Sequence, residues 1–305
     1  MILLLFVSVL IINSSNAKKK IHCDVVRDYG AKGNNETDDT KAIQKAIDEC
    51  NHVLLPKGNT FRVTESIALS SDLTIVMESN SSIFSDQSIC DPHDSSCIQN
   101  PRCPTLYWKK GPTSILCGSN LTNVALIGQD ARSSIIDGGG WKWYEAGVRN
   151  ASKWGIGPRT FELTWSENIT IRNLTFRNSP SWTIHPTFSK TILAENIRIE
   201  NPRFTPNTDG FDPDSCVDVI LRDSYIDTGD DGISIKSMNS TQPGSEHIMM
   251  PSKNIHIYNT KILSRNVCIG SATFGGVYVV VIDCEYYQTL THVTSFQIRR
   301  CNRGL

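Results

Sequence analysis

The sequence lacks an excess of charge of either sign. Its 305 residues contain 30 Lys and Arg against 31 Asp and Glu, which gives a formal net charge of -1. A chain without a basic surplus has no general electrostatic attraction for nucleic acid or for an anionic membrane surface, so we expect neither as a partner. The length is enough for one large domain or two small ones, and for a sizeable core.

Long apolar runs are also absent, apart from the first residues. The opening "MILLLFVSVLIINSSNA" holds an apolar run over 2–12 that is too short to span a bilayer. Small residues at Ser15 and Ala17 fit cleavage after Ala17, so the pattern indicates a secretory signal peptide over 1–17. A short N-terminal anchor is the alternative. We expect residues 18–305 to form a single secreted, soluble domain.

The features that are present suit an oxidising, extracellular compartment. None of the 10 cysteines falls in the signal, so all of them could form disulfides. Cys90, Cys97 and Cys103 lie near Asp91 and His93, where a metal site is the alternative to disulfides, but the spacing matches no strong zinc pattern. We predict no metal and no cofactor. Glycosylation motifs of the form Asn-x-Ser/Thr, more than chance would give, begin at Asn35, Asn80, Asn120, Asn150, Asn168, Asn173 and Asn239.

One segment near the N-terminus has the pattern of a helix. Residues 37–50 place their apolar side chains on one face, and Thr37 or Asp38 could cap the start. We expect this to be the only clear helix of the chain. The apolar face consists of Ala42, Ile43, Ala46 and Ile47.

After the helix, short β-rich runs recur at a nearly constant interval. The runs are rich in Val, Ile and Thr and are flanked by Asn, Asp or Ser. About 23 residues separate Ile169 from Ile192, and about 25 separate Ile192 from Val217. About 23 residues also separate Ile255 from Tyr278, after a longer interval that indicates a loop insertion. A leucine framework is absent and a propeller would need a period near 40, so the pattern predicts an all-β solenoid, a parallel β-helix.

Two short motifs hold closely grouped acidic residues: NTDGFDP (207–213) and TGDDG (228–232). An acidic residue beside a turn is usually solvated, which is the alternative here. Asp209 and Asp230 are, however, about 21 residues apart, which is one coil, and successive coils lie about 4.8 Å apart. We therefore expect Asp209 to meet Asp230 and Asp231 on one surface. Such clusters usually bind a cation or do acid–base work.

These two motifs resemble those of the family 28 glycoside hydrolases, the polygalacturonases. Three more stretches resemble that family: YGAKGNNETDDTKAIQKAIDEC (29–50), NSPSWTIHP (178–186) and CIGSATFGGV (268–277). The resemblance runs from about Val25 to the C-terminus. It implies a right-handed parallel β-helix with an N-terminal capping helix. It also implies hydrolysis of α-1,4-galacturonosyl bonds of pectin, an acidic polysaccharide of the cell wall, with inversion. We expect the secreted protein to be a monomer.

The acidic residues suit that chemistry. Glycoside hydrolysis needs one carboxylic acid to protonate the leaving oxygen and one carboxylate to activate water. The resemblance implies that Asp230 is the acid and that Asp209 and Asp231 position the water. The residues themselves do not separate these three roles.

Five further residues are candidates for binding the substrate. Lys236 could pair with a galacturonate carboxylate, and its alternative is a solvated strand lysine. Arg299 keeps a charge that the resemblance places near the substrate. His185 and Trp182 fall one coil before Asp209, where they either contact a sugar or pack in the core. Asn207 is the fifth candidate, with turn formation as its alternative.

Several positions depart from the family pattern. Residues 264–266 (Ser-Arg-Asn) stand where most of the family has Gly-His-Gly, Ala272 replaces an acidic residue, and Gln297 replaces an arginine. The chain ends at Leu305, where the family continues, so we expect the solenoid to be incomplete and uncapped at this end. Two alternatives to the hydrolase therefore stay open: an inactive, truncated β-helix that binds pectin, and a polysaccharide lyase.

Overall fold

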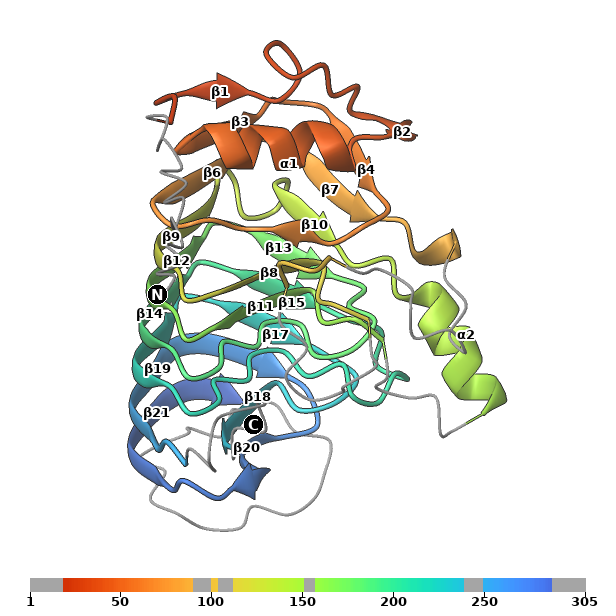
Figure 1. Cartoon of the computed structure of the whole chain (residues 1–305). Helices are drawn as coiled ribbons and strands as arrows, with labels where there is room; N and C mark the ends of the chain where they lie inside the picture. Colours follow the sequence, from red (N-terminus) through yellow and green to blue (C-terminus); the bar gives the residue numbers. More distant parts are fainter. Residues whose placement is uncertain (1–18, 90–99, 104–111, 151–156, 239–248, 287–305) are drawn as a thin grey trace, which may run out of the picture.

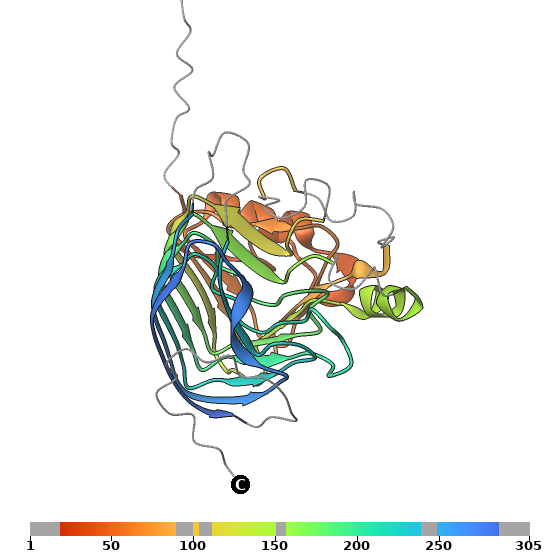
Figure 2. The same ribbon diagram turned by 90° about the horizontal axis from the view of Figure 1, so that it is seen from below.

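The chain forms a stack of parallel β coils. The computed structural model describes residues 19–89, 100–103, 112–150, 157–238 and 249–286. Every pairing between its strands is parallel, and each strand pairs with strands one coil away (Figure 1). Figure 2, which looks along the stack, shows the coils lying over one another. The prediction of a parallel β-helix is confirmed, and right-handed is the sense that parallel crossovers almost always take.

The strands lie on three faces of the stack, and β19 turns the corner between the first two. The first face holds β1 (Cys23–Asp24), β3 (His52–Leu55), β6 (Leu73–Met77), β9 (Thr122–Gly128), β12 (Glu167–Arg172), β14 (Lys190–Glu195), β16 (Val217–Arg222), β19 (Ser252–Leu263) and β21 (Val277–Tyr286). The second holds β2 (Asn34–Asp38), β4 (Thr60–Val63), β7 (Ser82–Ser85), β10 (Ile135–Asp137), β13 (Thr175–Arg177), β15 (Arg198–Glu200) and β17 (Tyr225–Asp227). The third holds β5 (Ile67–Ala68), β8 (Leu116–Ser119), β11 (Phe161–Thr164), β18 (Ile233–Ser237) and β20 (Val267–Thr273).

The core consists of apolar side chains stacked in columns inside the coils. On the first face, residues that pair from coil to coil are all buried; they are Val53, Ile75, Leu126, Ile171, Ala194, Leu221 and Ile257. Each coil therefore covers the apolar face of the one before it, which is how a solenoid buries surface that a single repeat would expose. Because strand residues alternate between faces, this column also fixes which residues point outward.

The predicted repeat is confirmed, but two of its three intervals are two residues longer than predicted. Ile192 pairs with Ile169, as predicted. It also pairs with Val219 and not with Val217, which pairs with Lys190. The error arises because the coils differ in length at their turns, while strands pair according to which residues face the core.

The last predicted register is shifted in the same way. Ile255 pairs with Val280, and the predicted partner Tyr278 pairs with Lys253. The longer interval before Ile255 is confirmed, because Val219 pairs with Ile255 across 36 residues. Part of the inserted loop, 239–248, lies outside the described residues.

The predicted capping helix forms, but it is shorter than expected. Helix α1 spans Thr40–Glu49 and packs against β3 and β5 at the N-terminal end of the stack (Figure 1). The predicted start at Thr37 is wrong, because 34–38 pair as strand β2. Asp38 still serves the helix start, since its carboxylate accepts hydrogen bonds from the Thr40 N–H (3.1 Å) and hydroxyl (2.5 Å).

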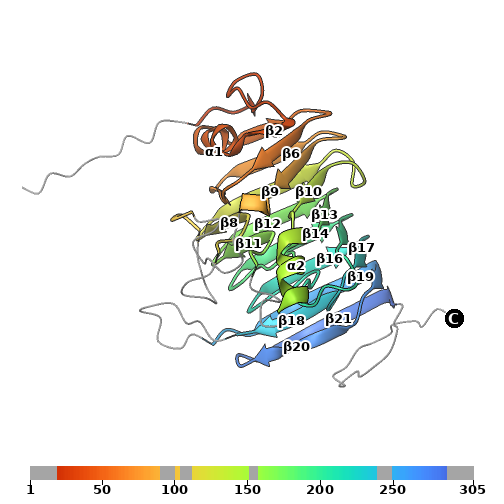
Figure 3. The same ribbon diagram turned by 90° about the vertical axis from the view of Figure 1, so that its right-hand side faces the viewer.

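The sequence analysis missed a second helix. Helix α2, Trp141–Arg149, lies along the outside of the stack (Figure 3) and buries Trp143 and Tyr144. Within the residues that the structure describes, neither α1 nor α2 is long and apolar enough to cross a membrane.

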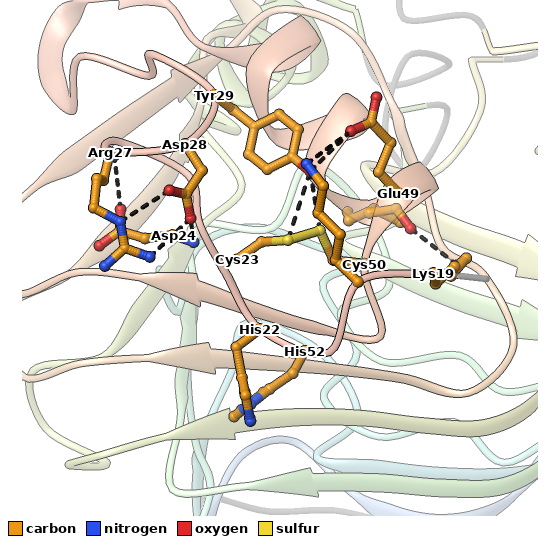
Figure 4. The surroundings of a disulfide bond; sticks show 12 residues. Lys19, His22, Cys23, Asp24, Arg27, Asp28, Tyr29, Glu49, Cys50 and His52 are labelled. Carbon is orange, nitrogen blue, oxygen red and sulfur yellow. Dashed lines mark hydrogen bonds and ion pairs between the residues drawn. A yellow bond between two sulfur atoms is a disulfide. The ribbon is translucent and has the colours of Figure 1, made fainter. Parts of the chain in front are cut away.

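A disulfide between Cys23 and Cys50 ties β1 to the end of α1 (Figure 4). The Tyr29 hydroxyl lies beside it and donates a hydrogen bond to Glu49 at 3.0 Å. A second disulfide joins Cys103 to Cys117, so the expectation of disulfides is confirmed for Cys103. The cluster around Cys90 and Cys97 lies outside the described residues.

Polar ladders mark two edges of the first face, where the backbone turns through the left-handed region with φ between +45° and +60°. Asn and Asp tolerate this region better than other non-glycine residues. Within the ladders, an amide on one coil donates to the side chain one coil before; for example, Asn168 donates to Asn123 at 2.8 Å and Asn196 donates to Asn173 at 2.9 Å. The positions are Asn123, Asn168, Thr191, Asp218 and Asn254 on one edge, and Asn173, Asn196, Asp223 and Asn259 on the other.

We expect Asn196→Ala to lower the free energy of unfolding by about 1–2 kcal/mol, because it removes a hydrogen bond and leaves a Cβ at φ +48° without local support. Asn196→Gly is the matched control, since glycine adopts this φ freely and loses only the hydrogen bond. Urea unfolding of the three proteins measures the difference. An alanine variant as stable as the wild type would show that the ladder contributes nothing.

Candidate active site

The third face brings the predicted acidic motifs together. A buried column of Phe161, Ile184, Phe211 and Ile233 pairs from coil to coil along this face. The residues that follow each of these stack in a second column, which holds Glu162, His185 and Asp212. A third column holds the residues two positions before the members of the apolar column: Arg159, Trp182, Asp209 and Asp231.

Asp209 lies beside the Asp230–Asp231 pair, as predicted, but its neighbour in the register is Asp231. The N–H of Gly210 donates to the Asp231 carbonyl at 2.9 Å, and the pairing of Phe211 with Ile233 gives an interval of 22 residues. The predicted 21-residue alignment with Asp230 is one residue short. Gly210 permits this close approach, because an added Cβ would lie 2.5 Å from the Gly232 carbonyl oxygen.

Lys236 and two aspartates form a buried charged cluster. Its ammonium donates to Asp212 at 2.5 Å and to Asp209 at 3.4 Å. Asp212 is fully buried, Lys236 is 5% exposed and Asp209 is 6% exposed. Two carboxylates thus share one cation, and a buried charge without full compensation is costly.

This arrangement raises the pKa of Asp209 well above its usual value. Burial is the main cause, and the nearby carboxylates of Asp212, Asp230 and Asp231 add to it, while Lys236 opposes it. Burial likewise raises the pKa of Asp212, although Lys236 again opposes the shift. Asp209 therefore holds a proton at a pH where an ordinary aspartate is ionised.

Asp230 and Asp231 are more exposed and have other partners. The backbone N–H of Asn207 donates to the Asp230 carboxylate at 2.6 Å. The Asn266 side-chain amide donates to Asp231 at 2.8 Å, and the Cys268 thiol lies 3.1 Å from the other Asp231 oxygen. Asn266 comes from the stretch where the family pattern has Gly-His-Gly, so here an amide contacts Asp231.

A second buried cluster of charged residues surrounds His185. The His185 ring is fully buried between Glu162, 3.0 Å from Nδ1, and Asp214, 3.6 Å from Nε2. Burial alone would raise the pKa of Glu162, but the charges of Arg159 and His185 outweigh it and lower the pKa.

Trp182 links the two clusters. Its ring packs edge-on against His185, with centroids 4.9 Å apart. The Lys236 ammonium lies 4.2 Å and the Arg159 guanidinium 4.7 Å from the ring centroid, so the ring contacts two cations. Such contacts stabilise cations in a desolvated site.

The structure gathers most of the predicted site residues. Asp209, Asp230, Asp231, Lys236 and Asn207 meet in one place. The alternative of a solvated strand lysine is wrong for Lys236, because both acidic partners bury it.

The other predicted site residues have different surroundings. His185 is buried, which matches the core alternative for its position, and Trp182 is half-buried. The alternative of solvated turn residues is wrong for Asp209. Arg299 lies outside the described residues.

Sequence reasoning missed several residues of the site. Asp212 lies in the quoted motif, but only its burial shows that it shares Lys236 with Asp209. Glu162 could have been found from the period, since it lies 23 residues before His185 in the same column. The contacts of Asn266 and Cys268 depend on the register between β18 and β20. That register could not be predicted, because a loop insertion of irregular length separates the two strands.

The comparisons with known proteins identify the family. The sequence pattern of glycosyl hydrolases family 28 matches residues 49–280. The chain belongs to this family, and the resemblance of the two aspartate motifs is confirmed. It is 31% identical over 274 residues to the "Probable polygalacturonase" of Vitis vinifera, covering 85% of this chain and 53% of the relative. The chain thus spans about half the length of that relative.

Solved structures show the same fold. The polygalacturonase from Erwinia carotovora ssp. carotovora matches with a TM-score of 0.70 and 23% identity, over 88% of this chain and 70% of that one. The exopolygalacturonase from Thermotoga maritima matches with a TM-score of 0.67 and 22% identity, over 88% and 67%. The β-helix is therefore common to this chain and to both enzymes.

Proposed function

We propose that this protein is a secreted glycosidase that hydrolyses α-1,4-galacturonosyl bonds of pectin or polygalacturonate with inversion. The observation that carries the proposal is the convergence of Asp209, Asp230 and Asp231 on one face, in a chain of family 28. The relatives named polygalacturonases support the substrate class. An acidic polysaccharide is then the partner, and we propose a monomer that needs no cofactor, nucleic acid or membrane.

Hydrolysis with inversion needs two roles from the three aspartates. Asp230, which is more exposed than Asp209, protonates the leaving oxygen. Asp209 and Asp231, which are neighbours in the register, accept hydrogen bonds from the attacking water and take its proton. Inversion requires the water to fit between acid and base, with carboxyl groups about 6.5–9.5 Å apart.

The raised pKa of Asp209 sets a limit on this mechanism. A base must be ionised to accept a proton, so activity falls as pH drops through the pKa of Asp209. Lys236 opposes the shift and thereby keeps Asp209 ionised at a lower pH than burial alone would allow.

The remaining candidates divide by exposure. Asn207 and Trp182 are partly exposed, so we assign them to the sugar-binding surface. Arg299, outside the described residues, is assigned to the same surface from the family resemblance alone. Lys236 and His185 are buried, so we assign Lys236 to positioning the aspartates and His185 to positioning Trp182. To bind a substrate carboxylate, the Lys236 ammonium would have to share its contacts with Asp209 and Asp212.

The test is a reducing-end assay of the full chain on polygalacturonate, run both with and without a calcium chelator. We expect new reducing ends that do not depend on calcium, without new ultraviolet absorbance, because hydrolysis forms no double bond. Calcium-dependent release with absorbance would identify a lyase. Binding of polygalacturonate without any release would identify the binding protein that the sequence left open.

A further inference from the structure

One corner of the stack carries aromatic residues where the backbone favours small polar ones. At the corner that leads from the third face to the first, successive coils place Asn120, Trp165, Phe188 and Ser215, with φ between +49° and +56°. Bulky side chains are uncommon in this left-handed region. Strain that a fold retains often marks a functional position.

The two aromatic residues form one wall of a pocket. The rings of Trp165 and Phe188 stack with centroids 4.4 Å apart and planes 9° from parallel. They line an open pocket of about 500 Å³ at the ends of β8 and β11. This volume lies within the range of about 300–1,000 Å³ that small-ligand sites have. The pocket is separate from the carboxylates of the candidate active site, none of which lines it.

The same pocket is lined by a complete glycosylation motif. Asn120, Leu121 and Thr122 form an Asn-x-Thr sequence, and all three line the pocket. Asn120 and Thr122 are exposed. Among the described residues, the hydrogen bond of the Asn120 amide is a long one, 3.4 Å, to the hydroxyl of the adjacent Ser119. Its nitrogen is therefore accessible at the edge of the pocket.

Two other motifs differ in this respect. The Asn168 amide donates to Asn123 at 2.8 Å within a ladder. Asn173 accepts a ladder hydrogen bond from Asn196 at 2.9 Å, and the hydroxyl of its motif residue Thr175 is buried against the Ala131 carbonyl. A glycan on Asn168 would attach to the nitrogen that makes this bond between coils, and the motif of Asn173 is held against the stack by its buried Thr175.

We propose that Asn120 carries an N-linked glycan and that the first sugar of this glycan lies in the pocket against Trp165. The attachment takes its sugar from a lipid-linked diphospho-oligosaccharide of the secretory pathway. A bond forms between the Asn120 amide nitrogen and the anomeric carbon, the bond from that carbon to the diphosphate oxygen breaks, and the amide loses one proton.

Physical chemistry favours this occupant. A sugar ring has an apolar C–H face that packs on an aromatic ring, and burying both faces removes apolar surface from water. The covalent link keeps the sugar at a high effective concentration beside the rings, so a weak contact suffices. Lys190 and Glu167, an exposed ion pair at 2.9 Å, supply polar groups at the rim for sugar hydroxyls.

The first experiment maps the glycans. The full chain is secreted from a eukaryotic host and treated with peptide N-glycosidase in heavy-oxygen water, and the tagged asparagines are found by mass spectrometry. We expect Asn120 to be occupied and Asn168 and Asn173 to be unmodified. Asn120→Gln and Thr122→Ala should each remove one glycan from the intact mass. An unmodified Asn120, or glycans on Asn168 and Asn173 in its place, would overturn the proposal.

The second experiment tests the contact with Trp165. Removing glycans from the native wild type should lower Tm by about 2 °C or more, because a stacking contact is lost. Removing glycans should not shift Tm in Asn120→Gln, which keeps the other glycosylation motifs, or in Trp165→Ala, which lacks the ring. In Trp165→Phe, part of the shift should remain. Equal shifts in wild type and Trp165→Ala would refute the stacking. A raised KM for polygalacturonate in Trp165→Ala, with Asn120 unoccupied, would assign the pocket to substrate instead.

Discussion

Replacing Asp209 by asparagine should lower the rate of polygalacturonate hydrolysis by about 100-fold or more, and at the same time stabilise the protein at pH 7. The loss of rate follows from its proposed role, since an amide has nearly the shape of the carboxylate but cannot accept the proton of water. The same loss is expected for Asp230→Asn and Asp231→Asn. The expected gain in stability rests on the raised pKa of Asp209.

The gain follows from the sign of its pKa shift. The folded protein holds the proton of Asp209 more tightly than the unfolded chain, in which an aspartate has its ordinary pKa near 3.9. Stability is therefore lost as pH rises from the ordinary pKa through the raised one. Asparagine has no proton to lose, and it leaves Asp212 and Lys236 as a one-to-one pair.

Thermal unfolding at pH 3.5 and pH 7, together with the reducing-end assay, checks both parts. The gain in Tm should be present at pH 7 and absent at pH 3.5. Asp218→Asn is the matched control, because this exposed aspartate lies in a ladder away from the site and accepts a hydrogen bond that an amide oxygen also accepts. An Asp209→Asn protein that is inactive but less stable at pH 7 than the wild type would contradict the charge argument.

The fold could be predicted because a solenoid repeats one rule. Every coil needs apolar residues at the same places, so the spacing of Ile169 and Ile192 was enough to indicate stacked strands. The registers at Val217 and Tyr278 could not be predicted, because turns of variable length separate the strands. Helix α2 was missed because it packs outside the stack, where no repeat constrains it.

The aspartates of the site could be predicted for the same reason, but their environment could not. One coil of spacing predicted that Asp209 meets the Asp230–Asp231 pair. That Lys236 is buried depends on how Asp212 and Trp182 surround it, and these contacts involve three different coils. The sequence alone does not distinguish a buried strand lysine from a solvated one.

Lys236→Met should lower the free energy of unfolding by about 3–5 kcal/mol at neutral pH, because it leaves the carboxylates of Asp209 and Asp212 buried without their cation. One oxygen of Asp212 already has no hydrogen-bond partner among the described residues. Without Lys236, the pKa of both carboxyls rises further, since the lysine opposes their shifts.

The loss should therefore be smaller at pH 4 than at pH 7, because more of the carboxyls are protonated at the lower pH, and it should grow as pH rises. The pKa of Lys236 itself is raised from 10.5, since Asp212 and Asp209 outweigh burial, so the lysine stays charged throughout this range and contributes none of the pH dependence. Lys236→Met combined with Asp212→Asn should recover part of the stability, because the second change removes one of the two buried carboxylates that the first leaves without a cation. Lys190→Met is the control, as its exposed pair with Glu167 should contribute about 1 kcal/mol or less. Urea unfolding at pH 4 and pH 7 measures the wild type, the two Lys236→Met variants and Lys190→Met. If Lys236→Met lost the same free energy of unfolding at both pH values, packing of the lysine stem, and not its charge, would account for its importance.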